Sequence, residues 1–106
     1  MIDNASGEVL VVLTAPPEIG ELIVDWLLAR EAPLGFTSTT VAGHSTRHDG
    51  LSTAEQVRGS QERLQFQVQM AAMDADEFLR SAADAFGAAG IHYWLVPVLA
   101  GGQLGR

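Results

Sequence analysis

Residues 64–70 carry the clearest pattern in the chain, a strict alternation of apolar and amide side chains. Leu64, Phe66, Val68 and Met70 alternate with three glutamines, so a strand here has an apolar face and an amide face. This alternation is typical of an antiparallel sheet that is covered on one side. The glutamines either face solvent or pair across a subunit interface that satisfies their amides. The chain is therefore expected to form a sheet with one buried face.

Three further segments predict strands. Residues 8–14 contain five consecutive apolar residues, 9–13, which are too few for a helix and fit a strand buried on both faces. Residues 36–42 are rich in threonine, whose branched side chain favours strands. Residues 93–99 are aromatic and β-branched, and Pro97 among them predicts an edge strand.

Two segments predict helices. Pro16 and Pro17 end the first strand, and apolar residues recur after them at helical spacing. These residues are Ile19, Leu22, Ile23, Trp26 and Leu27. Asp74 and Glu77 form a capping box for a second amphipathic helix, which Gly87 ends. Because Trp26 belongs to the apolar stripe, we expect it in the core.

The resulting order, β-α-β-β-α-β, predicts an α+β fold of the ferredoxin-like type, a four-stranded antiparallel sheet with two helices on one face. The 106 residues fit a single domain, residues 1–106, with a flexible N-terminus at 1–7. The other face of the sheet stays uncovered, and strand alternation points either Tyr93 or Trp94 toward it. An apolar face of that kind favours oligomerisation through the sheet.

Composition narrows the classes of partner. The net charge is −7, and all six Lys or Arg residues are arginines, so the chain repels nucleic acid and anionic membrane surfaces. There is no cysteine, which excludes disulfides, thiolate catalysis and cysteine-based zinc sites. The N-terminus lacks the features of a signal peptide, and no apolar run reaches about eighteen residues, so we expect a cytoplasmic protein.

The polar segment 43–62 separates the two middle strands. It is too long for a hairpin turn, and connections of this length are usually functional or disordered. Ser52 and Glu55 form a capping box, which predicts a short helix over 53–58. His44 and His48 lie four residues apart, and imidazole groups bind zinc, copper or nickel. Solvated loop histidines are the alternative.

Arginines in and beside this segment offer an anion site. They are Arg47, Arg58 and Arg63. Gly59 would let the backbone approach a ligand closely at the base of the segment. The alternative is that Glu55 and Glu62 pair with these arginines on the surface.

Catalysis finds little support in the sequence. There is no cysteine, no serine in a nucleophile elbow and no close carboxylate pair on one predicted face, so we do not expect an enzyme. The alternative is a small oxygenase of the same fold, acting as a dimer with an aromatic-lined pocket and a histidine. A pocket between sheet and helices would favour that alternative, and a filled core would count against it.

Short motifs are spread over residues 9–104. They are Gly35-Phe36-Thr37, Gly43-His44, Gly50-Leu51-Ser52, Glu55-Gln56-Val57 with Arg58-Gly59, and Ile91-His92-Tyr93-Trp94 with Pro97-Val98. In combination these motifs resemble an uncharacterised family of small P-II-like domains, whose members are similar to the P-II signalling proteins and the CutA proteins. Many of these members are encoded beside heavy-metal efflux pumps.

The resemblance implies a homotrimer in which segment 43–62 corresponds to the T-loop, through which P-II proteins touch their targets. It also implies a membrane transporter or efflux-pump component as a partner of that loop. In a trimer, one histidine per subunit near the axis gives three ligands, so we expect His44, His48 and His92 to bind metal. The other predicted ligand-binding residues are Arg47, Glu55, Gln56, Arg58 and Gly59.

The chain departs from the P-II type of ATP site. P-II proteins bind ATP with basic residues after the second helix and in a long C-terminal extension, whereas residues 87–90 have none and the tail offers only Arg106. His92 falls roughly where a phosphate-contacting lysine would be. The first expected effector is therefore a divalent metal ion, and a small anion or nucleotide is second. A module that binds only a protein partner is a further alternative.

Overall fold

The computed structural model describes residues 7–31, 34–44 and 60–105. These residues form four strands and two α-helices, with a short 3-10 turn before each helix. In chain order they are β1 (Glu8–Ala15), α1 (Gly20–Leu28), β2 (Phe36–Gly43), β3 (Gln61–Ala71), α3 (Ala75–Phe86) and β4 (His92–Val98). The predicted order of strands and helices is confirmed, and the short helix predicted over 53–58 lies outside the described residues.

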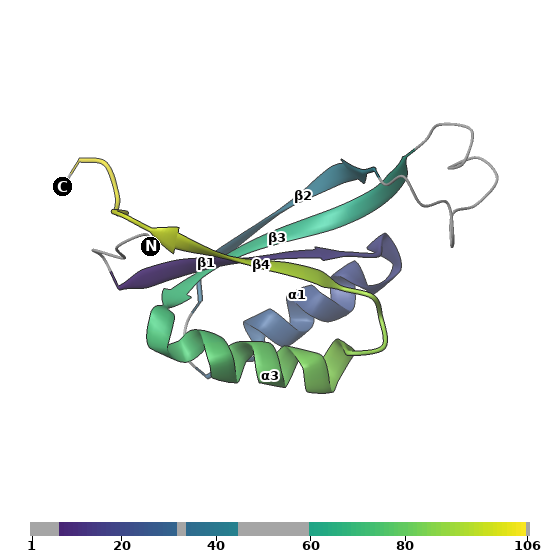
Figure 1. Cartoon of the computed structure of the whole chain (residues 1–106), viewed down its shortest axis with the longest axis horizontal. Coiled ribbons are helices and arrows are strands. Elements are labelled where there is room, and N and C mark those ends of the chain that lie inside the picture. The colour runs from purple at the N-terminus through teal and green to yellow at the C-terminus, as the bar shows by residue number, and fades with distance from the viewer. Residues whose placement is uncertain (1–6, 32–33, 45–59, 106) are drawn as a thin grey trace.

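The four strands form one antiparallel sheet in the order β2-β3-β1-β4. Both helices lie against the same face of this sheet (Figure 1). The fold is therefore the predicted α+β ferredoxin-like sandwich, with β2 and β4 at the two edges. The edge position that Pro97 predicts for β4 is also confirmed.

The core lies between the sheet and the two helices. Phe66 and Val68 of β3 are fully buried there, together with Ile23 of α1 and Phe78 of α3. The alternation predicted for residues 64–70 is confirmed, because the apolar side chains join the core while the glutamines lie on the other face. Burial of these large side chains supplies the main favourable free energy of folding.

The apolar stripe predicted for the first helix is wrong at Leu22, which is 59% exposed. A 3-10 turn, Pro17–Ile19, precedes α1, so the α-helical phase begins only at Gly20. Counted from there, the buried face of α1 consists of Gly20, Ile23 and Leu27. Ile23 and Leu27 of the predicted stripe are buried, and Ile19 and Trp26 pack against the core, so the predicted phase of the helix is confirmed and Leu22 is the exception.

The predicted capping box at the start of α3 does not form. Asp74 precedes the helix, but its side chain makes no capping hydrogen bond. Its φ and ψ of −92° and −10° belong to the preceding 3-10 turn, Ala72–Asp74, whereas a side-chain cap needs an extended backbone. The helix ends at Phe86, as predicted from Gly87. The left-handed residue before β4 is Gly90, with φ of 75°.

The β2–β3 pair extends beyond the rest of the sheet (Figure 1). β1 pairs with β3 only as far as Leu64, whereas β2 pairs with β3 out to Gln61. Gly43, predicted in the polar segment 43–62, is the last residue of β2, and Gln61 and Glu62 belong to β3. Residues 44–60 therefore form the connection between the two strands. Of this connection, only His44 and Ser60 are among the described residues.

Both ends of the described chain lie at the end of the sheet away from the projecting β2–β3 pair (Figure 1). Glu8, the first residue of β1, is paired with Val98, the last residue of β4. Among the described residues, neither α1 nor α3 has the length and apolar character that a membrane crossing requires.

Candidate functional site

The sheet face opposite α1 and α3, called the open face below, is built from alternate residues of all four strands. The pairing register sets these residues in rows across the sheet. From β2 toward β4 the rows are Thr39, Gln65, Thr14 and His92; then Thr37, Gln67, Val12 and Trp94; then Gln69, Leu10 and Val96. The half formed by β2 and β3 is therefore polar, and the apolar side chains gather on β1 and β4.

The apolar half of the open face is only partly covered. Val12 is 8% exposed, whereas Trp94 beside it on the edge strand is 60% exposed. Leu10 is partly exposed, and its neighbour on β4, Val96, is exposed. The prediction that the first strand is buried on both faces thus holds at Val12 and is wrong at Leu10. One copy of the chain exposes an apolar strip along β4, of the kind that partners bury.

Of the three glutamines that alternate with apolar residues over 64–70, two are satisfied within the chain. Gln65 Nε2 donates to Thr14 Oγ1 at 3.4 Å, and Gln69 Nε2 donates to Glu8 Oε1 at 3.1 Å. Gln67, whose neighbour on β1 is Val12, has no side-chain hydrogen bond to any described residue. The amide face is therefore neither purely solvent-facing nor wholly left to a partner, and Gln67 is the glutamine that remains available.

The structure places two of the three predicted histidines. His92 begins β4 and is exposed, and its ring lies 4.8 Å from the Trp94 ring in an edge-to-face arrangement. His44 follows the end of β2. In the pairing register, His92 of β4 is in the same row across the sheet as Thr39 of β2, three strand spacings away. His44, just after β2, follows Thr39 by five residues. At about 4.8 Å per strand and 3.3 Å per residue, His44 and His92 are roughly 20 Å apart in one copy.

This spacing means that one copy does not bring His44 and His92 together around one metal ion. In the part of the chain that the structure describes, there is no group of three or more His, Cys, Asp or Glu side chains that could hold a metal. The remaining predicted site residues lie outside that part of the chain: Arg47, His48, Glu55, Gln56, Arg58 and Gly59.

Of the three arginines in the predicted anion site, the structure describes Arg63. It lies on the open face and donates a hydrogen bond to Oε1 of Gln61, two residues away on the same face of β3. Glu62 is on the opposite face of the strand, so it does not compete for this guanidinium. Arg63 therefore stands at the base of the connection between β2 and β3, and its hydrogen-bond partner among the described residues is Gln61.

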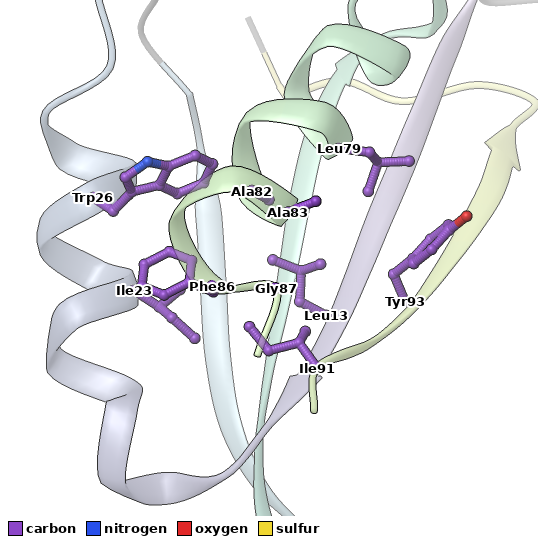
Figure 2. Close-up of a pocket in the computed structure, with 10 residues that line it drawn as sticks. All are labelled: Leu13, Ile23, Trp26, Leu79, Ala82, Ala83, Phe86, Gly87, Ile91 and Tyr93. Carbon is purple, nitrogen blue, oxygen red and sulfur yellow. The ribbon is translucent and has the colours of Figure 1, made fainter. Parts of the chain in front are cut away.

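A cavity lies on the other side of the sheet, between the sheet and the helices, with a volume of about 210 Å³ (Figure 2). Its walls include Ile23 and Trp26 of α1, Phe86 of α3 and Tyr93 of β4. The oxygenase alternative predicts such a pocket, but this lining has no histidine or carboxylate, because His92 lies on the open face. The cavity offers a place for a small molecule, with the hydroxyl of Tyr93 as the one acid–base side chain in its lining.

Sequence reasoning missed this cavity. The signal that points to it is a set of small residues on α3 and its C-terminal cap, namely Ala82, Ala83 and Gly87. These positions face large side chains of α1 and β4, and small residues leave the space between them unfilled. Trp26, expected in the core, instead lies at its margin and is partly buried.

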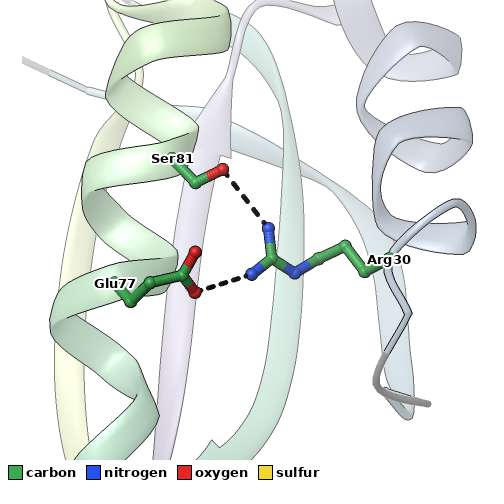
Figure 3. Close-up of polar contacts among 3 residues, drawn as sticks. All are labelled: Arg30, Glu77 and Ser81. Atoms are coloured by element: carbon green, nitrogen blue, oxygen red, sulfur yellow. Dashed lines mark hydrogen bonds and ion pairs between the residues drawn. The ribbon is translucent and has the colours of Figure 1, made fainter.

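A polar cluster joins the two helices beside this cavity (Figure 3). Arg30, just after α1, donates to Glu77 Oε2 at 3.0 Å and to Ser81 Oγ at 3.5 Å, both on α3. The guanidinium carbon also lies 5.0 Å from the ring centres of Trp26 and Phe78. Arg30 thus holds α1 against α3 through charge and through aromatic faces at once.

These features define a small ferredoxin-like domain with a half-apolar open face, a projecting β2–β3 pair and an apolar cavity behind the sheet. The chain belongs to the family described as proteins of unknown function, DUF3240, whose model matches residues 5–105. The predicted membership of an uncharacterised family is therefore confirmed at this level.

A solved structure supports the same assignment. The chain is similar to a DUF3240 family protein from Shewanella baltica OS155, whose crystal structure was determined at 2.40 Å resolution. The similarity has a TM-score of 0.77 at 27% sequence identity and covers 94% of this chain and 99% of that one. The search of curated proteins found no match.

Proposed function

We propose that the protein is a P-II-like homotrimeric sensor or adaptor of the cytoplasm that accompanies a heavy-metal efflux or transport system. Its effector is a small ligand, in the first place a divalent metal ion. Binding at the cleft between subunits orders or moves the connection 44–60, through which the protein touches a transporter component. Catalysis is not part of this proposal, and the net charge of −7 argues against nucleic acid as a partner.

The observation that carries the proposal is the apolar strip along β4 on the open face. Trp94 and Val96 are exposed there next to Leu10, and Gln67 has an amide without a partner among the described residues. A sheet-to-sheet contact between copies would cover the apolar strip and give this amide a partner. The resemblance to P-II-like domains supplies the number of copies, which is three.

The spacing of the histidines adds a condition on metal binding. Because His44 and His92 are roughly 20 Å apart in one copy, a metal ion that uses both must take them from different copies. Metal binding and assembly are then coupled, so the metal stabilises the oligomer and the oligomer binds the metal more tightly.

The test of assembly compares two arginine substitutions by light scattering coupled to gel filtration. Trp94→Arg places a charge in the proposed interface, and Leu22→Arg is the matched control, because Leu22 on α1 is 59% exposed and Trp94 is 60% exposed. The wild type and Leu22→Arg should elute as trimers, and Trp94→Arg should shift toward monomer. A monomeric wild type would contradict the proposal, and a dimer would favour the oxygenase alternative.

The test of the effector is thermal unfolding with a panel of divalent metals and nucleotides at fixed protein concentration. A metal present at a hundred times its dissociation constant should stabilise the protein by about 2.7 kcal/mol. Replacing His44 and His48 together should abolish this stabilisation without dissociating the oligomer. If every metal and nucleotide leaves a trimeric wild type unchanged, the ligand-free adaptor replaces the sensor.

A further inference from the structure

The cavity between the sheet and the helices is a structural feature that the proposed function does not use. It lies on the helix side of the sheet, so it is separated from the open face by the strands themselves. Figure 2 shows α1, α3, β1 and β4 contributing side chains around one space, which measures about 210 Å³. A cavity of about 150 Å³ with an apolar lining stays dry and binds benzene, so this one is large enough for a small organic molecule.

The lining decides the chemistry of such a molecule. Leu13 and Ile23 form its buried wall, and no charged side chain contributes to the lining. The side-chain polar atoms in it are the indole nitrogen of Trp26 and the hydroxyl of Tyr93, and the hydroxyl points away from the other labelled side chains (Figure 2). A charged ligand would lose its hydration there without gaining a partner, so the cavity favours a neutral and mainly apolar molecule.

The shape of the lining favours a flat ring over an aliphatic chain. Trp26 and Phe86 lie 5.6 Å apart at an interplanar angle of 83°, and Tyr93 lies across the space from them. A ring that enters between these side chains meets both ring faces and ring edges, which is the geometry aromatic groups prefer. The volume is smaller than that of pockets for drug-sized ligands, which begin at about 300 Å³. One ring or two fused rings therefore match the space.

The backbone restricts one of the small residues that open the cavity, Gly87. A β-carbon at Gly87 would meet the backbone oxygen of Ala83 at 2.5 Å, so a side chain there requires the end of α3 to shift. Ala83, Gly87 and Tyr93 are exposed, whereas Leu13 and Ile23 are buried, so the cavity opens between α3 and β4. A side chain at position 87 is thus disfavoured, and the cavity is reachable from solvent.

From these observations we propose that the cavity between α1, α3 and β4 is a binding site for a small neutral aromatic molecule of one or two fused rings. The cavity lies on the other side of the sheet from the proposed interface, and its lining includes none of the predicted metal ligands. It therefore stands or falls separately from the proposed function.

The test uses indole as the probe and records amide and indole N–H signals by NMR on the wild-type chain. The two tryptophans provide an internal control, because Trp26 lines the cavity and Trp94 lies on the open face. Indole should move the signals of Trp26, Ala83 and Gly87 in a saturable way and leave the Trp94 side chain unaffected. Benzyl alcohol should move the same signals, whereas benzoate, with a similar ring but a negative charge, should not.

Two identical substitutions on α3 test the site itself. Ala82→Leu fills the cavity, and Ala85→Leu adds the same side chain at an exposed position of α3 that does not line it. Affinity for indole should fall at least about tenfold in Ala82→Leu and stay unchanged in Ala85→Leu. Ala83→Leu, at the rim, provides a second filling variant if Ala82→Leu does not fold. No saturable shift in the wild type, shifts centred on Trp94, equal binding of benzoate, or undiminished binding in a folded filling variant would overturn the proposal.

Discussion

The contact of Arg30 with α3 allows a sharp prediction, because two different interactions meet at one guanidinium. Figure 3 shows an ion pair with Glu77, which would commonly be taken as the main link between the helices. The rings of Trp26 and Phe78 lie 5.0 Å from the same guanidinium carbon. We expect the aromatic contacts to contribute more to stability than the ion pair.

The magnitudes follow from exposure. The Glu77 side chain is 70% exposed, and exposed ion pairs contribute about 0.2–1 kcal/mol, so Glu77→Gln should cost about 0.5 kcal/mol. The Arg30 side chain is only 20% exposed, and a cation over an aromatic face contributes about 0.5–2 kcal/mol depending on desolvation. Arg30→Met keeps most of the apolar stem but removes the charge, so it should cost about 1–2 kcal/mol.

Urea unfolding at fixed protein concentration, followed by circular dichroism, measures both costs, and Arg30→Met/Glu77→Gln closes a double-mutant cycle. The coupling free energy between Arg30 and Glu77 should be about 0.5 kcal/mol and should fall in high salt. The remaining cost of Arg30→Met should persist in salt. If Glu77→Gln costs as much as Arg30→Met, or if salt removes the whole effect, the ion pair dominates and the reasoning is refuted.

Three further predictions concern stability, and all are measured as shifts in the urea midpoint. Phe66→Ala removes a fully buried ring and should lower the free energy of unfolding by about 3–5 kcal/mol. Phe36→Ala removes a partly buried ring whose centre is 6.5 Å away and should lower it clearly less; equal losses would contradict the placement of the core. Gly20→Ala puts a β-carbon 2.5 Å from Leu64 Cδ2, the end of a flexible side chain that must shift. The substitution should therefore stabilise a Leu64→Ala background by up to about 1 kcal/mol and the wild type by clearly less; equal gains in both would refute the clash. Gly90→Ala should cost about 1–2 kcal/mol because φ there is 75°, and a neutral result would show that the turn adapts.

The sheet was predictable because its signals are local. The alternation over residues 64–70 assigns each side chain to a face before any partner strand is known, and Pro97 excludes β4 from the centre of the sheet. The exact starts of the helices were less predictable. Leu22 belongs to the apolar stripe by spacing but is exposed, and the 3-10 turn before α3 took Asp74 out of cap geometry.

The candidate sites depended on distances that a sequence does not contain. The spacing of His44 and His48 suggested a shared metal ion, but the position of His92 relative to His44 follows only from the strand register. The cavity could not be foreseen from Ala82 or Gly87 alone, because small residues on a helix usually mean close packing. It arises here because the residues opposite them do not fill the space.

The first and last strands of the described chain end at one end of the sheet, where Glu8 lies beside Val98, and the β2–β3 pair projects from the other, where Gly43 lies beside Gln61. This geometry decides how the molecule can be attached to a surface. A tag on either terminus holds the domain with the tip of β2–β3 directed away from the support and accessible to a partner in solution. A label on the β2–β3 tip would occupy the region that the adaptor proposal assigns to binding, so immobilisation through the termini is the orientation in which partner capture is informative.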